Sequence, residues 1–424
     1  MNSYRIKGAK DSNGKVSDFF LSNGKFVNEN ELAKGAEVID ADGLTLLPGF
    51  VDLHAHLREP GREDAETVLS GSLAAAAGGF TAISAMPNTL PVADTAGVVE
   101  QVYRLGKHHG ICDVFPIGAV TVGQGGEKLA ELSAMNQSEA GVRIFSDDGY
   151  CVFDALVMRR ALEYVKTFDG IIAQHAQDPR LTQDAQMNEG EISARLGLKG
   201  WPAVAEEAII ARDVLLAEHV DSRLHICHVT TAGGVEIIRT AKKRGIKVSA
   251  EVTPHHLLLT DDLAESYDPV YKVNPPLRTK DDVQALREGL ADGTIDVIAT
   301  DHAPHPHESK DCEWSAAAFG MVGLETAFSI AYLAMVETKL LTLSQLVDRI
   351  SKIPAQIGRY EGHGSIEIGS IANFTLVDLE SKWKVQRQNL ASKSKNTPFD
   401  GMALPGVVKK TFHNGALVYE RNSK

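Results

Sequence analysis

The feature that most constrains the fold is a series of eight short apolar runs across the middle of the chain, most of them followed by a segment of helical composition. Strands that alternate with helices and are apolar along nearly their whole length indicate a parallel sheet covered by helices. The expected strands are Phe50–His54, Phe80–Met86, Val114–Val120, Val142–Ser146, Gly170–His175, Leu224–His228, Lys247–Val252 and Asp296–Thr300. Eight such units are the number that closes a (β/α)8 barrel.

The segments between these runs are expected to form the helices of an α/β fold. The clearest are Glu66–Ala77, Gly97–Lys107, Asp154–Thr167, Ala205–His219, Gly234–Lys243 and Lys280–Leu290, and two more are expected at Leu324–Val336 and Ser344–Ile350. An open, doubly wound sheet would normally carry a glycine-rich phosphate turn after its first strand. Here the first strand runs into His-Ala-His instead, which favours the TIM-type barrel.

The two ends of the chain have a different pattern. Short alternating runs with turn pairs such as Asn13-Gly14 come before the barrel, and runs such as Ala372–Val377 and Ala416–Tyr419 follow it. This pattern predicts strands. We therefore expect a small β-sandwich-like domain built from both termini, with boundaries at 1–48, 49–360 for the barrel, and 361–424.

Composition limits the class of partner. The chain has 43 Lys and Arg against 56 Asp and Glu, a net charge of −13, which disfavours nucleic acid as a partner. No apolar run reaches membrane-spanning length and the first residues lack the apolar core of a signal peptide, so we expect a cytoplasmic protein without a membrane partner. The four scattered cysteines predict neither a disulfide framework nor a thiolate zinc site.

Polar side chains gather where the predicted strands end, which in a barrel of this type is the catalytic rim. The rim residues are His54 and His56 on the first strand, Asp147 and Asp148 on the fourth, His175 on the fifth, His228 on the sixth and Asp301 on the eighth. His54 and His56 share a face because alternate residues of a strand point the same way. By the same rule only one of His225 and His228 should face the interior, and His228 is nearer the rim.

Imidazole and carboxylate without thiolate are ligands for a catalytic zinc ion or another divalent first-row metal. Four histidines and two aspartates exceed what one open metal site needs, which suggests two metals about 3.5–4 Å apart that share a carboxylate. Strand alternation does not choose between Asp147 and Asp148 as that carboxylate. Each residue alone has an ordinary explanation, such as a turn at Asp147–Gly149, and it is their joint placement at one rim that predicts a metal site.

Ten motifs occur in order between about residue 36 and residue 420. They are GFVDLHAHLREPG (49–61), AMPNT (85–89), SDDG (146–149), AQHAQD (173–178), HICHVTT (225–231), EVTPHHLLLTDD (251–262), NPPLR (274–278), ATDHAPH (299–305), FGMVGLET (319–326) and KNTPFDG (395–401). Together they resemble the dihydroorotase family of the amidohydrolase superfamily, whose barrels are of the metal-dependent hydrolase type.

The resemblance implies specific metal ligands. His54, His56 and Asp301 would hold the more buried zinc ion, His175 and His228 the more exposed one, and Asp148 would bridge the two. Many superfamily members bridge their metals with a carboxylated lysine on the fourth strand, but residues 142–148 contain no lysine. The aspartate-bridged class is therefore the one that matches.

The resemblance also implies a substrate and a reaction. The reaction is the reversible hydrolysis of dihydroorotate to N-carbamoyl-L-aspartate in pyrimidine biosynthesis, with Asp301 as the residue that moves the proton. Residues implied in substrate binding are His56, Arg58, Asn88 and His305, with Asn274 and the backbone of Phe319 and Gly320 around the amide and imide edge. His255 and His256 match no role in the pattern and are interpreted as structural.

Two alternatives remain at this point. One is another cyclic amidohydrolase of the hydantoinase or allantoinase type, which typically uses the absent lysine and needs no carboxylate clamp. The other is a non-catalytic dihydroorotase-like partner of aspartate transcarbamoylase, which the complete ligand set argues against. A homo-oligomer, and association with aspartate transcarbamoylase, are expected from the family. Residues 306–318 have the composition of a mobile loop over the barrel mouth.

Overall fold

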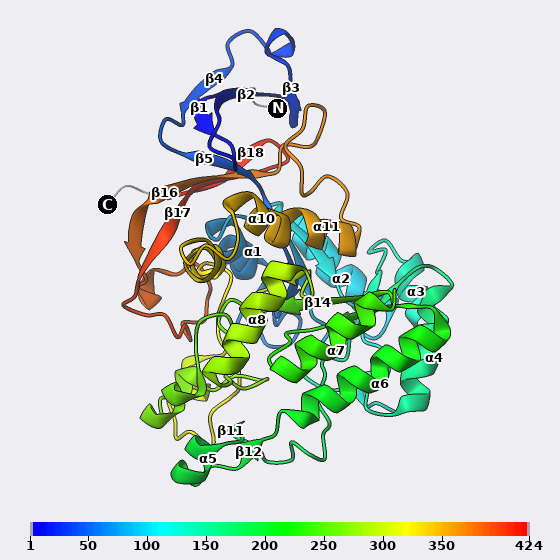
Figure 1. Ribbon diagram of the computed structural model, residues 1–424. Helices are drawn as coiled ribbons and strands as arrows, with labels where there is room; N and C mark the ends of the chain where they lie inside the picture. Colours follow the sequence, from blue (N-terminus) through cyan, green and yellow to red (C-terminus); the bar gives the residue numbers. More distant parts are fainter. Residues whose placement is uncertain (1–2, 422–424) are drawn as a thin grey trace.

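The computed structural model describes residues 3–421, and it places an α/β body below a smaller sheet that contains both ends of the chain (Figure 1). Every apolar run expected from the sequence contains a strand. These strands are β6 (Phe50–Ala55), β7 (Phe80–Ala85), β8 (Asp113–Pro116), β9 (Ile144–Phe145), β10 (Ile171–Gln174), β13 (Arg223–Ile226), β14 (Val248–Val252) and β15 (Val297–Ile298). Several are shorter than predicted, because the residues at their ends turn away to carry polar side chains.

All pairings among these eight strands are parallel. One sheet has the order β6-β7-β8 and the other has the order β9-β10-β13-β14-β15. Isolated parallel bridges connect them: Gly118 pairs with Phe145 between β8 and β9, and Ala55 pairs with His302 between β6 and the segment after β15. The pairing therefore returns to the strand on which it began.

Helices cover the outer side of these strands. The long ones are α1 (Val68–Ala77), α2 (Ala96–His109), α4 (Ala155–Lys166), α6 (Val204–Val220), α7 (Ala232–Lys243) and α8 (Lys280–Asp292). In Figure 1, α4, α6, α7 and α8 lie side by side. Helix α4 shows the local cause, since the side chain of Asp154 accepts hydrogen bonds from the amides of Leu156 and Val157 and so starts the helix.

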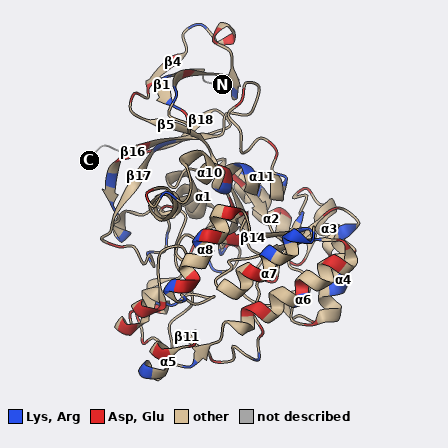
Figure 2. Ribbon diagram, in the orientation of Figure 1, with Lys and Arg blue, Asp and Glu red and all other residues tan. Residues whose placement is uncertain are grey.

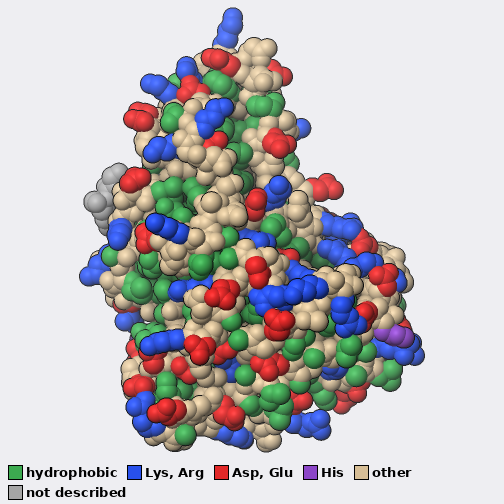
Figure 3. Space-filling view, in the orientation of Figure 1, with side chains coloured by type: hydrophobic (Ala, Val, Ile, Leu, Met, Phe, Trp, Pro, Cys, Tyr) green, Lys and Arg blue, Asp and Glu red, His purple; other side chains and the backbone are tan. Residues whose placement is uncertain are grey.

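The helices bury one apolar face against the strands and expose a charged one. On α4 the buried residues are Met158, Ala161, Leu162 and Val165, spaced three or four apart. Figure 2 shows Asp and Glu along the outer faces of α6 and α8, and Figure 3 shows both signs of charge mixed over the same side of the molecule. Within residues 3–421, none of the helices combines the length and the apolar character that crossing a bilayer requires.

Some shorter elements differ from the expectation. The predicted helix Leu324–Val336 is α9 (Ala327–Ala331) followed by a π-helical turn over Tyr332–Val336. The predicted helix Ser344–Ile350 is likewise α10 (Leu343–Val347) followed by a π-helical turn. Elements that the sequence did not indicate are α3 (Leu132–Gln137), α5 (Glu191–Leu196), α11 (Ile353–Gly358), β11 (Met187–Asn188) and β12 (Gly200–Trp201). Most of these hold too few residues to show a periodic pattern.

The two ends of the chain meet in one mixed sheet. Its order is β18-β17-β16-β5-β1-β2-β3, with β4 paired to β1. The strands are β1 (Tyr4–Lys10), β2 (Val16–Ser22), β3 (Lys25–Val27), β4 (Glu37–Asp40), β5 (Thr45–Pro48), β16 (Phe374–Lys384), β17 (Ala403–His413) and β18 (Ala416–Glu420). Leu46 of β5 pairs with Leu376 of β16 in an antiparallel ladder. A strand of the N-terminal segment therefore lies directly beside a strand of the C-terminal segment.

A small aromatic core supports this sheet. The rings of Phe374 and Phe412 stack with centroids 4.4 Å apart, and Phe26 packs against Phe374 at 5.5 Å. The strands form a single sheet by their pairing, so the two-layered sandwich stays a prediction. The outermost residues of the two predicted terminal segments, 1–2 and 422–424, lie outside the described part of the chain.

Candidate active site

The two histidines at the end of β6 face a pair of aspartates inside the body. The Nε2 atoms of His54 and His56 each lie 3.3 Å from Oδ2 of Asp148. Oδ1 of Asp301 lies 3.5 Å from Nε2 of His54 and 3.2 Å from Nε2 of His56. All four side chains are buried. Two imidazoles and two carboxylates thus converge from β6, β9 and the segment after β15.

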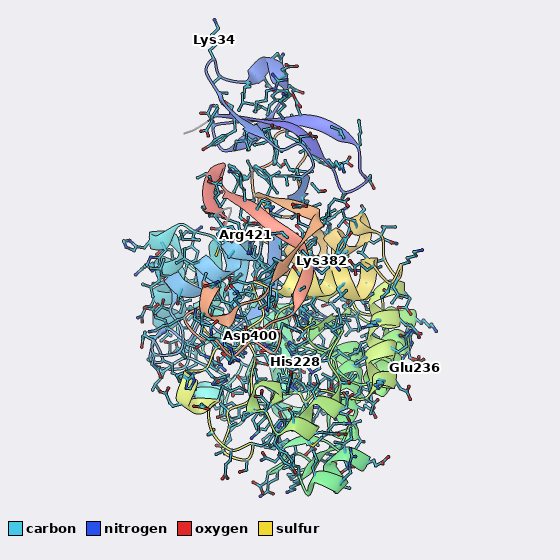
Figure 4. All side chains as sticks on the ribbon, turned by 90° about the vertical axis from the view of Figure 1, so that its left-hand side faces the viewer. Lys34, His228, Glu236, Lys382, Asp400 and Arg421 are labelled. Atoms are coloured by element: carbon cyan, nitrogen blue, oxygen red, sulfur yellow. The ribbon has the colours of Figure 1, made fainter. Side chains whose placement is uncertain are left out.

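A second pair of histidines lies on the other side of Asp148. Oδ1 of this carboxylate is 3.1 Å from Nδ1 of His175 and 3.1 Å from Nε2 of His228. Figure 4 shows His228 in the interior of the body, away from Glu236 on the outer face of α7. Asp148 therefore turns one oxygen toward each histidine pair.

These residues fit the metal site expected from the sequence. His54, His56 and Asp148 form one group whose ligand atoms lie within 4.8 Å of one another, and Asp148, His175 and His228 form another. The Nε2 atom of His54 is fully buried and lies near two carboxylate oxygens, but it makes no hydrogen bond with any residue in the range 3–421. Nitrogen and oxygen donors of this kind suit divalent first-row metals.

The structure also separates the two adjacent aspartates that strand alternation left open. The carboxylate of Asp147 accepts hydrogen bonds from the amides of Val120 and Thr121 and from the hydroxyl of Thr121. Asp147 is thus occupied in holding the neighbouring loop. Only Asp148 reaches the histidines.

Three residues of the site have left-handed backbone conformations that side chains rarely adopt. Their φ angles are 63° for Arg58, 30° for His228 and 45° for Asp301. Such conformations cost about 1–3 kcal/mol each and persist only where the surroundings enforce them. Here each one turns a side chain from a strand end toward the common interior.

Charge inside the site keeps the two aspartates ionised. Burial by itself would raise the pKa of Asp148, but His54, His175 and His228 hold that pKa well below its ordinary value. Burial opposes ionisation of Asp301 in the same way, and the hydrogen bond with His56 together with the other histidines brings its pKa to about 2. Both groups are therefore carboxylates at neutral pH.

Glu251 on β14 supports the histidines and was not identified from the sequence. Its Oε1 lies 2.6 Å from Nδ1 of His54 and accepts from the amide of His228, while its Oε2 lies 3.0 Å from Nε2 of His225. A carboxylate behind a ligating histidine fixes the orientation and tautomer of the ring. A charged residue inside a short, mostly apolar strand was the signal that could have revealed it.

The expectation that only one of His225 and His228 faces the interior is wrong. The ring of His225 contacts Glu251, and the ring of His228 contacts Asp148, so both side chains point into the site. Strand β13 ends at Ile226 and His228 has a positive φ, so the alternation rule no longer applies at that position.

Other polar side chains orient the remaining histidines. Oδ1 of Asn88 lies 2.8 Å from Nδ1 of His56, and Oε1 of Gln177 lies 2.6 Å from Nε2 of His175. The amide nitrogen of Gln124 donates to the backbone oxygen of Asp148. Gln124 and Gln177 were not predicted, because nothing in their local sequence marks them as site residues.

A cavity of about 460 Å³ opens beside these groups. It is lined by every residue that the sequence assigned to substrate: His56, Arg58, Asn88, Asn274, His305, Phe319 and Gly320. Asp148, His175 and Asp301 line it as well. The structure therefore brings four of the six expected metal ligands and all of the expected substrate contacts to one cavity.

Arg58 is the positive group of this cavity. Its side chain is buried, its Nε donates to the backbone oxygen of Pro304, and its Nη2 lies 3.5 Å from Nε2 of His305. It forms no ion pair with any residue in the described range 3–421. Burial lowers the pKa of Arg58 to about 10, so the guanidinium stays charged at neutral pH and is available to an anion.

The predicted backbone contacts at Phe319 and Gly320 are partly used within the protein. The amide of Gly320 donates to the backbone oxygen of Lys272, and the oxygen of Phe319 lies 2.7 Å from Nε2 of His305. Asn274, by contrast, has a buried Oδ1 that finds no hydrogen-bond partner in the part of the chain that the structure describes. A ligand in the cavity would meet the side chain of Asn274 more readily than the amide of Gly320.

Comparison with known proteins adds sequence relatives of nearly full length. A family model described as "Dihydro-orotase-like" matches residues 43–233. A dihydroorotase of Streptomyces coelicolor is 64% identical over 418 residues, which is 98% of each chain. A dihydroorotase of Mycobacterium tuberculosis is 54% identical and covers 90% of this chain and 89% of its own.

This chain belongs to the dihydroorotase family. As a family member it is an enzyme of the cyclic amidohydrolase group. Membership rests on identity along almost the whole sequence, including both terminal segments of the mixed sheet.

Solved structures show how widely the dihydroorotase-family fold is shared. An L-hydantoinase from Arthrobacter aurescens superposes with a TM-score of 0.88 at 27% identity, covering 100% of this chain and 97% of its own. A dihydropyrimidinase from Brevibacillus agri has a TM-score of 0.83 at 23% identity, covering 99% and 95%, and shows the fold alone. In the present chain, Asp148 lies between the two histidine pairs. No lysine is among the described residues that line the cavity.

Proposed function

We propose that this chain catalyses the reversible hydrolysis of dihydroorotate to N-carbamoyl-L-aspartate, a step of pyrimidine biosynthesis. The observation that carries the proposal is the meeting of two features in one cavity. Asp148 lies between two histidine pairs, and Arg58 presents a buried positive charge without an ion-pair partner in the described residues 3–421. The substrate has one ring amide to open and one carboxylate to anchor, which matches this combination.

We further propose that the eight parallel strands form a closed (β/α)8 barrel. The return of the pairing from the segment after β15 to β6 supports closure. The proposed division is 1–48 and 361–424 for the small β domain and 49–360 for the barrel. The pairing of β5 with β16 supports joining the two terminal segments.

The proposed cofactor is zinc, two ions per chain. His54, His56 and Asp301 would hold one, His175 and His228 the other, and Asp148 would contact both. When bound, such ions lower the pKa of water from 15.7 to about 7 and polarise a carbonyl oxygen. The buried, unpartnered Nε2 of His54 and the two oxygens of Asp148 support this assignment.

The side chains of this protein have defined tasks in the proposed reaction. Arg58, with Asn88 and His305, binds the ring carboxylate, because a guanidinium fork matches a carboxylate bidentately. Asp301 is ionised at neutral pH, so it can accept the proton of the attacking water. The same proton then goes to the ring nitrogen, which leaves as the C–N bond breaks. In the cyclisation direction Asp301 removes that proton from nitrogen.

The proposal is tested by following both directions of the reaction against pH, before and after metal removal by a chelator. We expect activity to disappear with the metal and to return on addition of zinc. Replacing Asp148 by Ala should lower the metal content and reduce both directions by at least about a thousandfold, since it removes the group that contacts both histidine pairs. Full activity and metal content in Asp148→Ala would show that Asp148 does not bridge.

The same assay separates the alternatives. Faster turnover of hydantoin or allantoin than of dihydroorotate would replace the proposed substrate. Absence of metal and of activity in carefully purified protein would instead favour the non-catalytic partner of aspartate transcarbamoylase. Cytoplasmic location, homo-oligomer formation and association with aspartate transcarbamoylase stay predictions.

A further inference from the structure

The segment 306–318, which we call the strap, joins two residues of the cavity. It begins after His305 and ends before Phe319, and both of these line the cavity. Apart from one short helical turn, His307–Ser309, the strap has no regular secondary structure. Its shape must therefore come from specific contacts rather than from a repeating hydrogen-bond pattern.

Lys272 holds the middle of the strap. Its side chain is 2% exposed, and its Nζ donates to the backbone oxygens of Trp314 at 2.7 Å and Ser315 at 3.3 Å. The same ammonium lies 4.4 Å from the ring centroid of Phe319, within the range of a cation–π contact. The backbone oxygen of Lys272 accepts the amide of Gly320. Lys272 thus contacts the strap itself and the two residues that follow it, Phe319 and Gly320.

Lys310, which is part of the strap, connects the strap to the main chain at Lys272. Its Nζ donates to the backbone oxygen of Lys272 at 3.0 Å and to that of Ala318 at 2.8 Å. The strap also pairs with itself, since the amide of Ala318 donates to the oxygen of Ser309. The two lysines and the strap therefore form one connected set of main-chain contacts.

Neither ammonium has a carboxylate partner among the described residues 3–421. Burial lowers the pKa of Lys272 to about 8, and burial together with the charge of Lys272 lowers the pKa of Lys310 to about 7. Lys310 is therefore only partly charged at neutral pH, and placing the charged form of either lysine here without a carboxylate opposes folding. A strap that only had to cover the core would need no such groups, so the charges suggest a role at the cavity.

We propose that Lys272 and Lys310 are positioning residues for the ring-opening reaction, holding the strap so that His305 and Phe319 keep their places against the substrate. This inference rests on the proposed function. His305 is the link, because its Nε2 contacts the oxygen of Phe319 at 2.7 Å and lies 3.5 Å from Arg58. Release of the strap would loosen the carboxylate-binding side of the cavity while leaving Asp148 and its four histidines in place.

The test compares Lys272→Met and Lys310→Met with wild type in steady-state hydrolysis of dihydroorotate. Methionine keeps most of the side-chain length and removes the donors and the charge. We expect KM to rise about tenfold or more with a smaller change in kcat. The reason is that the contacts of His305 and Phe319 with the substrate are expected to be equally strong in the bound substrate and in the transition state. Metal content should stay at the wild-type level. Lys310→Arg, which restores donors and charge, should recover most of the loss.

Limited proteolysis with chymotrypsin gives a second readout that needs no turnover. Cleavage at Trp314 or Phe319 should be several-fold faster in both methionine variants than in wild type, and slower again in Lys310→Arg. Lys242→Met is the control, since Lys242 is half-buried and lies away from the cavity, where it donates to the oxygen of Gly293 and to the carboxylate of Asp296. This control should change neither KM nor strap cleavage.

Wild-type KM and wild-type strap cleavage in Lys310→Met would overturn the proposal, as would an equal rise of KM in the Lys242→Met control. If Lys272→Met does not fold because Lys272 is buried, the variants of the half-buried Lys310 alone test whether the lysines hold the strap. If wild-type protein does not turn over dihydroorotate, the proposed function fails. Strap cleavage in the variants then still shows whether the lysines hold the strap.

Discussion

At the residue scale, the site depends on a few side chains in which different polar atoms serve different partners. Asn88 is an example, because its Oδ1 orients His56 and leaves its amide group for the cavity that it lines. Asp148 serves two histidine pairs with its two oxygens. Arg58 differs from both, since its charge has no carboxylate partner among residues 3–421 and so remains for a ligand.

Replacing Arg58 by Lys tests this assignment. A lysine keeps the charge but cannot present the planar fork, so kcat/KM for dihydroorotate should fall about 10- to 100-fold, mostly through KM. Binding of 5,6-dihydrouracil, which has the same ring without the carboxylate, should change little when measured as inhibition.

Arg62→Lys is the control, because Arg62 is exposed at the edge of the same cavity. It should behave as wild type. An equal loss of affinity for the two rings in Arg58→Lys would mean that Arg58 does not recognise the carboxylate.

At the element scale, the strand ends matter more than the strands. β9 and β15 are only two residues long, yet the turns that follow them deliver Asp148 and Asp301. The outer helices fix these strands by close packing. On α2, buried Gly106 lies so close to β8 that a Cβ there would come within 2.6 Å of Cβ of Val114.

The variant Gly106→Ala tests whether this contact decides the packing of α2. Alanine favours a helix over glycine by about 1 kcal/mol, but overpacking a core costs about 1–3 kcal/mol. We expect the second effect to win and the free energy of unfolding to fall by about 1 kcal/mol or more in denaturant titration.

Gly97→Ala in the same helix is the matched control, since a Cβ at that position meets nothing within 4 Å. It should leave the free energy of unfolding unchanged or raise it by up to about 1 kcal/mol. Stabilisation by both substitutions would show that α2 moves freely relative to β8.

At the scale of the whole molecule, the chain between β16 and β17 returns to the α/β body and contacts residues that are distant in the sequence. The amide of Ser392 donates to Glu325, its hydroxyl contacts Glu66 at 2.5 Å, and Glu66 lies 3.2 Å from His302. His302 neighbours Asp301, so the C-terminal segment reaches the residues behind the site. The small sheet is therefore connected to the α/β body through side chains as well as through β5.

Glu325 predicts a pH dependence of stability. Burial raises the pKa of Glu325 to about 7, above the ordinary value of 4.5, although the amides of Ala391 and Ser392 oppose the shift. The folded protein then binds more protons than the unfolded chain between these two values. Stability is accordingly greatest below pH 4.5 as far as this group is concerned, and is lost as pH rises through 7.

Glu325→Gln should remove this loss. Between pH 5 and pH 8 the wild-type free energy of unfolding should fall relative to that of the variant by on the order of 2 kcal/mol. Denaturant titrations of both proteins at several pH values measure the difference. Parallel pH profiles would show that Glu325 titrates as it does in water.

Much of the fold and of the site was predictable because it depends on residues that are close together in the sequence. Each predicted strand is a short apolar run, and each predicted ligand follows such a run, so the periodicity of a strand and the chemistry of imidazole and carboxylate were enough. The substrate residues came from resemblance, and the structure places them around one cavity.

The sequence by itself determined the order of strands and helices, the candidate ligands and the family resemblance, because these depend on neighbouring residues. Strand alternation left Asp147 and Asp148 open, the resemblance pointed to Asp148, and the tertiary structure places Asp148 against the histidines. Only the tertiary structure revealed that Glu251 contacts two histidines and that Lys272 contacts the strap. Glu251 and His54 are 197 residues apart, and Lys272 and Trp314 are 42 apart. Contacts of this kind arise from the packing of strand ends and loops, which no local pattern encodes.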